Sequence, residues 1–419
     1  MPDATERLLE RFIRYARVHT TSDENSMTFP STARQLDLAR VLVAELKALG
    51  VDARLDANGY VYALLPERLP VGHPARGKAP AIGFIAHMDT SQDAPGANVK
   101  PQVHRAYAGG DIVLPGDPAQ VIRVADTPVL GEHKGHDIVT SDGTTLLGAD
   151  DKAGVAAIME AIERWQHDPS IPHGTIAIAF TPDEEVGRGV DRFDVPGFGA
   201  TIAYTLDGEE LGKIEKETFN AHAATFRLQG YNIHPGTAKD RMVNTLYAAA
   251  EIIRRLPEDM RPETTEKRQG YVHPRAIDGT VDACTIHLLI RDFDLRGSKA
   301  KIGLLEKIRD EVSALLPQTK IALEVKESYL NMGPKVDEDP RIFEVAMEAT
   351  RRVGVEPHLD VIRGGTDGAR LSYMGILTPN VFTGGANYHS VREWVSLQAM
   401  EKATQVIHEI AMLWVEQSV

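Results

Sequence analysis

The apolar residues near the N-terminus recur at the spacing of amphipathic helices. Residues 6–18 place apolar side chains on one face, which predicts a first helix. A second helix is predicted over residues 32–49, where leucines form the apolar stripe and Gly50 marks the end. Two short strands are expected to follow, over 51–55 and 60–65, joined by a tight turn.

Three later segments are short, apolar and partly β-branched, as buried strands of an α/β sheet are. They cover residues 81–86, 175–180 and 201–206, and each is closely followed by ionisable side chains. Since ligands of open α/β sheets bind beyond the carboxyl ends of the strands, these side chains are expected to converge on one region. They are His87, Asp89, Glu184, Glu185 and Asp207.

A fourth acidic segment lies at the start of a predicted helix. Residues 146–152 lead into an amphipathic pattern over 153–165, which places Asp150 and Asp151 near the helix N-terminus. Carboxylates are stabilised there by unpaired N–H groups and by the helix dipole. The segment therefore supplies further acidic groups to the same predicted domain.

Between residues 218 and 327 the pattern changes to strand-like and helical segments separated by loops. We interpret this stretch as an inserted second domain, which leaves residues 1–217 and 328–419 as a discontinuous α/β domain. A chain of 419 residues exceeds the size at which one hydrophobic core usually stops growing, so two domains are expected. The predicted elements of the insertion are strands at 221–228 and 281–290 and helices at 244–255 and 298–316.

Composition limits the class of protein. A hydrophobic fraction of 42% and a charged fraction of 25% are ordinary for a globular chain. No apolar run approaches the roughly 20 residues that a membrane-spanning helix needs, and the first residues lack the apolar core of a signal peptide. Cys284 is the single cysteine, which excludes an internal disulfide and fits a reducing compartment. These features favour a cytoplasmic location.

The formal net charge is −14, which argues against a nucleic-acid partner because phosphate binding requires a basic face. It also argues against binding to an anionic membrane surface. Several carboxylates at one site are costly unless cations neutralise them, so we expect part of the acidity to belong to a metal site.

The sequence contains a donor set for two zinc ions. Such a pair needs one shared carboxylate, about two further ligands for each ion, and an open coordination position for catalysis. Glu184 can act as general base on the metal's water while its neighbour binds metal. Asp89 can orient the nearby imidazole or another ligand. The candidate ligands are His87, Asp150, Glu185, Asp207 and His389.

Other signals are weaker. His133 and His136 have zinc-like spacing, but they lie in a glycine-containing loop without a partner pair, so metal binding is not expected there. Neither Gly-x-Ser-x-Gly nor His-Glu-x-x-His occurs, so a serine hydrolase and a single-zinc gluzincin lack their signatures. Cys284 is expected to lie in a core.

Five motifs resemble, in order and spacing, the dizinc exopeptidases of the M20 class. Two longer stretches, over 234–244 and 363–368, are similar to the tripeptide aminopeptidases of that class, and residues 290–294 agree with them. The resemblance covers nearly the whole chain, and the ordered combination of motifs makes it specific. The motifs are HMDT from His87, GADDKAG from Gly148, TPDEEVG from Thr181, DG from Asp207 and NYH from Asn387.

The resemblance implies a mixed-sheet α/β catalytic domain with an inserted, smaller α+β lid that serves in dimerisation. It also implies two Zn²⁺ ions per chain, although Co²⁺ and Mn²⁺ share these ligand types. In that pattern one zinc takes His87 and Asp207, the other takes Glu185 and His389, and Asp150 bridges them.

The resemblance gives further roles to residues around the metals. Glu184 is the general base and later the proton donor, and Asp89 positions the ligands. Asp151 is expected to be a helix cap or an exposed acid, because the family pattern places the ligand one residue earlier.

In the lid, the resemblance implies that His234 and Arg291 bind the substrate, with Asn244 as a weaker candidate. Arginine suits bidentate capture of a carboxylate, which a short peptide carries at its C-terminus. A fixed distance from this clamp to the metals would limit peptide length. The implied activity is removal of the N-terminal residue from short unblocked peptides, chiefly tripeptides.

Two other functions are compatible with the sequence. A dipeptidase, a carboxypeptidase or an N-acyl amino acid deacylase of the same class would share the metal site. A non-catalytic, zinc-stabilised binding protein is the more distant alternative, since a structural site needs no base such as Glu184. The preference for the first side chain, the physiological metal and the oligomeric state, including action of a lid residue in a partner's site, stay open.

Overall fold

The computed structural model describes residues 3–419, which fold into two compact units. The first unit contains the chain up to Lys216 and continues through Pro334–Asp360 and Thr366–Val419. The second unit contains Glu217–Gly333 and Val361–Gly365. In the part of the chain that the structure describes, no helix combines the length and the hydrophobicity needed to cross a bilayer.

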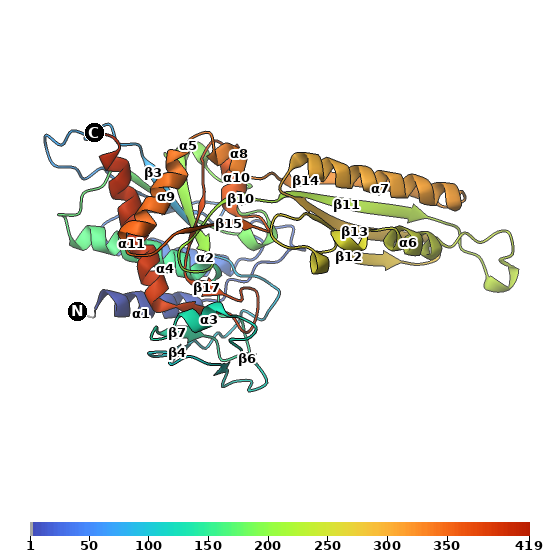
Figure 1. The fold of residues 1–419 in the computed structure, drawn as a ribbon, viewed down its shortest axis with the longest axis horizontal. Helices are drawn as coiled ribbons and strands as arrows, with labels where there is room; N and C mark the ends of the chain where they lie inside the picture. Colours follow the sequence, from blue (N-terminus) through green and yellow to red (C-terminus); the bar gives the residue numbers. More distant parts are fainter. Residues whose placement is uncertain (1–2) are drawn as a thin grey trace. The chain divides into compact units, whose positions relative to one another are not determined.

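The first unit is built on an eight-stranded mixed sheet, which confirms the predicted fold class (Figure 1). The three apolar segments predicted as strands lie next to one another in parallel in its centre, in the order β8-β3-β9. Next to this core, β2 runs antiparallel to β8, and the edge strand β1 runs antiparallel to β2. The full order is β1(Asp52–Leu55), β2(Val61–Leu65), β8(Ile176–Thr181), β3(Ile82–His87), β9(Ile202–Gly208), β16(Asn380–Phe382), β10(Lys213–Thr218) and β15(His358–Ile362).

Helices cover both faces of this sheet, because its central strands are apolar on both sides. Side chains alternate between faces along β3, so Phe84 packs into the larger core while Ile85 packs into the opposite one. Gly83 leaves room for the Phe198 ring, which would overlap a β-carbon at that position. The larger core is formed with α1(Ala4–Ala16), α2(Gln35–Ala48), α4(Ala149–His167), α9(Arg341–Arg352) and α11(Leu397–Glu416), and the smaller one with α5(Val195–Phe198) and α10(Asp367–Tyr373).

Two small sheets and two short helices complete the first unit. Their strands have two or three residues each, which is too short for a readable hydrophobic period, and the sequence did not predict them. They are β4(Gln102–His104), β7(Ile138–Thr140), β18(Trp394–Ser396) and β17(Gly385–Ala386) in one sheet, β5(Ile112–Val113) and β6(Val121–Ile122) in the other, and helices α3(Val129–Glu132) and α8(Gly333–Val336), the latter beginning at the unit boundary.

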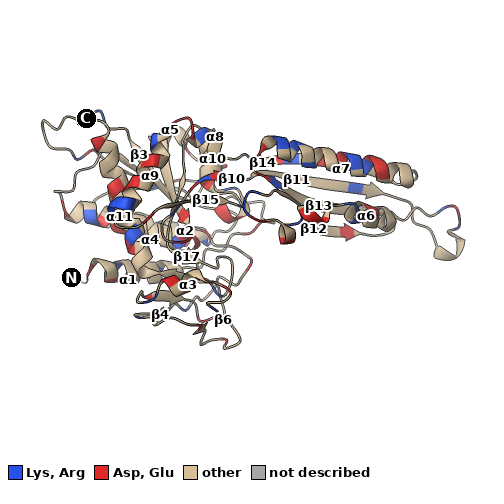
Figure 2. Cartoon of the chain, in the orientation of Figure 1, with Lys and Arg blue, Asp and Glu red and all other residues tan. Residues whose placement is uncertain are grey.

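The second unit is an antiparallel four-stranded sheet with both long helices packed on one face (Figure 1). Its core contains Phe226 and Ile286 from the sheet and Leu305 from α7. Acidic and basic residues are interspersed along the exposed side of α7 (Figure 2), and Lys307 lies 3.8 Å from Glu311 one turn later. The elements, in sheet order, are β12(Tyr271–Gly279), β13(Ala283–Asp292), β11(Asn220–Gln229) and β14(Lys320–Tyr329), with α6(Thr245–Arg254) and α7(Leu295–Leu315).

Candidate metal centre

The ends of three neighbouring strands bring the predicted ligands together in the first unit. His87 is the last residue of β3, and Asp207 is the penultimate residue of β9 beside it. Glu184 and Glu185 follow β8 in a short 3₁₀ turn, η1(Glu184–Val186). Because β8, β3 and β9 are parallel neighbours, their carboxyl ends meet at one edge of the sheet.

His87 contacts two carboxylates through one ring nitrogen. Its Nε2 lies 2.9 Å from Asp150 Oδ1 and 3.6 Å from Asp207 Oδ1, and the residue is only 3% exposed. Its Nδ1 lies 3.1 Å from the backbone oxygen of Asp89. A carbonyl oxygen can only accept, so Nδ1 carries a proton and donates it, and Nε2 is the nitrogen that can bind a metal. Although burial opposes the shift, hydrogen bonds to Asp150 and Asp207 raise the pKa of His87 well above its ordinary value, so a metal ion would displace the proton of Nε2.

His389 faces the other side of Asp150. Its Nε2 lies 3.2 Å from Asp150 Oδ2 and 2.9 Å from Glu185 Oε2, while its Nδ1 lies 3.2 Å from Asp93 Oδ2. Asp150 thus turns one carboxylate oxygen toward each histidine. This arrangement matches a carboxylate shared between two metal positions.

The electrostatics of this cluster fit cations. Burial, followed by the charge of Asp150, raises the pKa of Glu185 to about 8, and burial raises the pKa of Asp207 to about 6. Burial alone would lower the pKa of His389, but hydrogen bonds to Asp150 and Glu185 raise it to about 12. The pKa of Asp150 is instead held well below its ordinary value, because its hydrogen bonds with His389 and His87 outweigh the effect of burial. Glu185 and Asp207 therefore tend to keep protons, and divalent ions bound here would replace those protons.

One carboxylate oxygen of the cluster is buried and unpaired. Glu185 Oε1 is buried and has no hydrogen-bond partner among the described residues, although burying an unpaired carboxylate oxygen is costly. Together with two imidazole nitrogens and the other carboxylates, this oxygen gives the donor types that zinc binds. The residues present therefore fit a metal ion.

Asp89 holds the two glutamates in place. Its fully buried carboxylate accepts hydrogen bonds from the backbone N–H groups of Glu184 and Glu185, at 3.0 and 3.2 Å. Its backbone oxygen accepts the hydrogen bond from His87 described above. One residue thus fixes both a strand-end histidine and the turn that carries the acidic pair.

The Glu184 carboxylate differs from its neighbour, because no described residue forms a hydrogen bond or ion pair with it. Burial is the largest cause that raises the pKa of Glu184 well above its ordinary value, while the charge of His87 opposes the shift. A half-buried, unpaired carboxylate of this kind can accept and return a proton.

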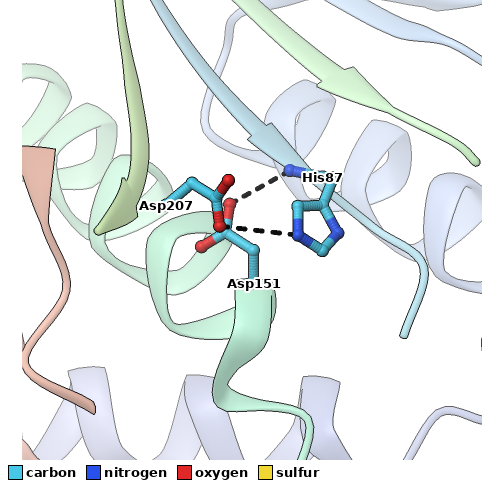
Figure 3. A group of neighbouring side chains, drawn as sticks. All are labelled: His87, Asp151 and Asp207. Carbon is cyan, nitrogen blue, oxygen red and sulfur yellow. Dashed lines mark hydrogen bonds and ion pairs between the residues drawn. The ribbon is translucent and has the colours of Figure 1, made fainter. Parts of the chain in front are cut away.

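Asp151 corrects one expectation, because it is not an exposed acid. The residue is 1% exposed, and its carboxylate accepts from the backbone N–H groups of His87 and Gly154, at 3.1 and 3.2 Å. Figure 3 shows it beside His87 and Asp207, with which it forms a metal-sized group. Since both of its oxygens already accept backbone hydrogen bonds, the capping alternative describes Asp151 better than a ligand role.

Asp93 and Asp367 lie near this site and were not predicted from the sequence. Asp93 contacts His389, but a single acid in a polar loop gives no sequence signal. Asp367 is buried and accepts a 2.6 Å hydrogen bond from Thr181 Oγ1, and burial raises its pKa to about 7. Asp367 lies in the glycine-rich motif at 363–368, and this motif was the sequence feature that could have identified it as a residue of the site.

His133 and His136 lie elsewhere in the first unit. Their Nδ1 atoms are 3.1 Å apart, and His136 Nδ1 is 2.8 Å from Ser396 Oγ. Burial and the neighbouring His136 lower the pKa of His133 to about 4, which keeps the ring neutral. These contacts account for the pair as packing and hydrogen bonding.

The three candidate substrate residues belong to the second unit. Asn244 caps α6, since its side-chain oxygen accepts from the backbone N–H of Leu246 at 2.9 Å. His234 is exposed, and its Nδ1 accepts from the N–H of Gly236 at 3.1 Å. Arg291 donates through Nη1 to the backbone oxygens of His222 and Ile290.

Comparison with known proteins gives a consistent result. Residues 138–413 match the model of peptidase family M20/M25/M40. The chain is 48% identical to peptidase T of Caldanaerobacter subterraneus subsp. tengcongensis, over 97% of this chain and 98% of that one. It is 47% identical to peptidase T of Geobacillus kaustophilus, over 98% of each chain.

Solved structures show the same fold. Aminopeptidase PepT from Bacillus cereus superposes with a TM-score of 0.75 at 23% identity, covering 98% of this chain and 99% of that one. A tripeptidase from Staphylococcus aureus gives 0.77 at 21% identity and 99% coverage of both. A dinuclear metal-binding peptidase of the M20 family from Bacillus subtilis gives 0.65 at 14% identity, again with 99% coverage of both.

Proposed function

This chain belongs to peptidase family M20/M25/M40, and we propose that it is a two-zinc aminopeptidase of the cytoplasm that removes the N-terminal residue from short unblocked peptides, chiefly tripeptides. The relatives named peptidase T support the peptidase activity and the substrate class. One observation supports the two-metal site most directly: Asp150 turns opposite carboxylate oxygens toward His87 and His389.

The distances between the donor atoms support two metal positions. We assign His87 and Asp207 to one ion and Glu185 and His389 to the other, with Asp150 shared between them. When bound, two divalent ions polarise the peptide carbonyl and make a water molecule a better nucleophile near neutral pH. Zinc is proposed on the basis of the ligand types, which cobalt and manganese also accept.

Glu184 carries the proton in this mechanism. Asp89 fixes the backbone of the turn, so the carboxylate of Glu184 stays at the cluster without being bound by a neighbour. It accepts the proton of the attacking water as the new carbon–oxygen bond forms. It then returns the proton to the leaving nitrogen as the peptide bond breaks, so the group ends the cycle unchanged.

We assign substrate binding to the second unit, residues 218–327 in the sequence-based division. Arg291 is proposed to bind the peptide's C-terminal carboxylate, because a guanidinium pairs with a carboxylate in a bidentate manner. His234 and Asn244 are proposed as further contacts with the peptide backbone. The same unit is proposed to mediate a homodimer.

A panel of peptides tests the activity. Purified protein loaded with zinc is given di-, tri- and tetrapeptides, each with a free and an acetylated N-terminus, and the released residues are identified. The proposal predicts that free tripeptides are cleaved fastest and that acetylated ones are resistant. Equal turnover of acetylated peptides would instead indicate a deacylase or carboxypeptidase of the same family, and full metal content without turnover would indicate a binding protein.

A further inference from the structure

Glu393 is a buried carboxylate whose partners are the backbone of another segment. It is 1% exposed and lies between His389 and strand β18. Its Oε2 accepts hydrogen bonds from the N–H groups of Leu147 and Gly148, both at 2.7 Å. Its Oε1 accepts from the N–H of Asp150 at 3.0 Å.

These three hydrogen bonds fix the main chain that presents Asp150. Residues 147–150 turn into helix α4 through Gly148, which has a φ of +78°, a conformation that glycine adopts without strain. The Glu393 carboxylate bonds three of the four backbone N–H groups in this turn. The direction of the Asp150 side chain toward both histidines therefore depends on it.

The same loop that carries Glu393 also carries a metal ligand. His389 precedes Glu393 by four residues and contacts Asp150 Oδ2, while Glu393 contacts the backbone nitrogen of Asp150. One short loop thus holds Asp150 at two points, once at its side chain and once at its main chain. A change at Glu393 would alter the relative placement of a shared ligand and a terminal ligand together.

We propose that Glu393 is a positioning residue for the two-metal centre, which orients Asp150 so that one oxygen faces each metal position. The inference rests on the proposed function, since it assigns a role toward the metals named there. Residues that hold a metal ligand in place without touching the metal typically contribute a factor of about 10 to 100 to the metal affinity. Glu393 differs from most of them because it holds the ligand's backbone rather than its side chain.

A buried carboxylate can also serve only to stabilise a fold, and the chain offers a matched control of that kind. Glu160 is fully buried in α4 and pairs with Arg7 at 2.8 Å, Arg164 at 3.1 Å and Arg11. It contacts none of the candidate ligands. Its replacement should lower stability without changing metal affinity.

The test compares Glu393→Gln with Glu160→Gln in the full chain. Zinc affinity is measured by competition with a chromophoric chelator, and the melting temperature Tm is measured on the metal-free proteins. The amide oxygen of glutamine can accept from Leu147 and Gly148, but its NH₂ group then meets the N–H of Asp150, another donor. Glu393→Gln is expected to bind zinc about 10- to 100-fold more weakly, and Glu160→Gln is expected to keep wild-type affinity with a lower Tm.

A Glu393→Asp variant covers the case in which the glutamine variant does not fold. It keeps the charge and both acceptor oxygens but is one methylene too short, so it should give a smaller loss of zinc affinity in the same assay. If the Glu393 variant that folds binds zinc as tightly as the wild type, the role of Glu393 is overturned but the proposed two-metal function is not. A wild-type chain that binds no divalent ion overturns the proposed two-metal function with it.

Discussion

The candidate metal ligands in the first unit and the candidate substrate residues in the second unit have different structural origins. Most of the candidate ligands lie at or just after the ends of parallel strands and at the start of α4, so the fold itself places them together. His234, Arg291 and Asn244 come from a turn, a strand and a helix cap, and each has a local partner already. The first group can be recognised because its side chains meet in the structure. The second group is assigned only from the resemblance to a family.

The two groups also differ in how their polar atoms are satisfied. In the metal cluster, Glu185 keeps a buried oxygen without a partner and carboxylates crowd together, so something is required to complete it. In the second unit, the side chain of Asn244 already completes the first turn of α6. A binding site with unpaired buried polar atoms can therefore be recognised in a structure that lacks the ligand. A binding site whose polar atoms already form hydrogen bonds within the protein cannot be recognised in this way.

The largest effect is expected from removing the shared carboxylate. Asp150→Ala should empty both metal positions, because each histidine loses the oxygen that faces it. Activity should fall by more than about 10⁴-fold, beyond the usual loss for a general base alone. Elemental analysis of the purified variant measures the metal content, and Asp168→Ala, at the exposed end of the same helix, is the control. Full metal content in Asp150→Ala would break the assignment of a shared ligand.

Glu184→Gln should separate chemistry from metal binding. Glutamine has nearly the same shape but cannot accept a proton, so kcat should fall about 10²- to 10⁴-fold while KM changes little. Both metals should remain, since Glu184 is not among the assigned ligands. Steady-state kinetics and metal analysis on one sample give both results, with the exposed Glu10→Gln as control. Unchanged turnover would contradict the role of Glu184 as base.

The sequence predicted the central strands and the convergence of their ionisable residues because these elements are regular. Strands β3, β8 and β9 are mostly apolar and end in, or are closely followed by, ionisable residues, so their pattern indicated both the sheet and the edge where those residues meet. The roles of individual ligands followed from the resemblance to a family.

Other features could not be predicted from local pattern. Glu393 accepts a hydrogen bond from the backbone N–H of Gly148, 245 residues earlier in the chain. Every residue except proline has such an N–H group, so the residue type at that position does not reveal the contact. Strands of two residues, such as β17, cover a single alternation of side chains, which is too little to show a pattern. Strand β14 was missed although Ile321, Leu323 and Val325 alternate with exposed or charged positions, so a stricter count of alternation would have found it.

Arg291→Lys should sharpen the assignment of the second unit. Lysine keeps the charge but lacks the planar pair of donors, and a charge-assisted hydrogen bond contributes about 1.5–3 kcal/mol. KM for a tripeptide should therefore rise about 10- to 100-fold with kcat nearly unchanged. The same peptide with an amidated C-terminus lacks the carboxylate, so the variant and the wild type should then have similar KM values.

The exposed Arg227→Lys, on strand β11 of the same unit, is the control for this experiment. It should leave KM unchanged for both peptides. If Arg291→Lys weakened the free and the amidated tripeptide equally, Arg291 would not be the group that binds the carboxylate, and the substrate assignment in this unit would lose its main support.

The smallest effect concerns Asn244, where a cap and a substrate contact are both assigned to one side chain. Asn244→Ala removes the acceptor of the Leu246 N–H and should cost about 0.5–2 kcal/mol of stability in urea unfolding. Asn244→Asp keeps that acceptor, so stability should be retained, but a carboxylate cannot donate a hydrogen bond to a peptide. A higher KM in the aspartate variant at unchanged stability would therefore identify a substrate contact, whereas an unchanged KM in both variants would restrict Asn244 to capping α6.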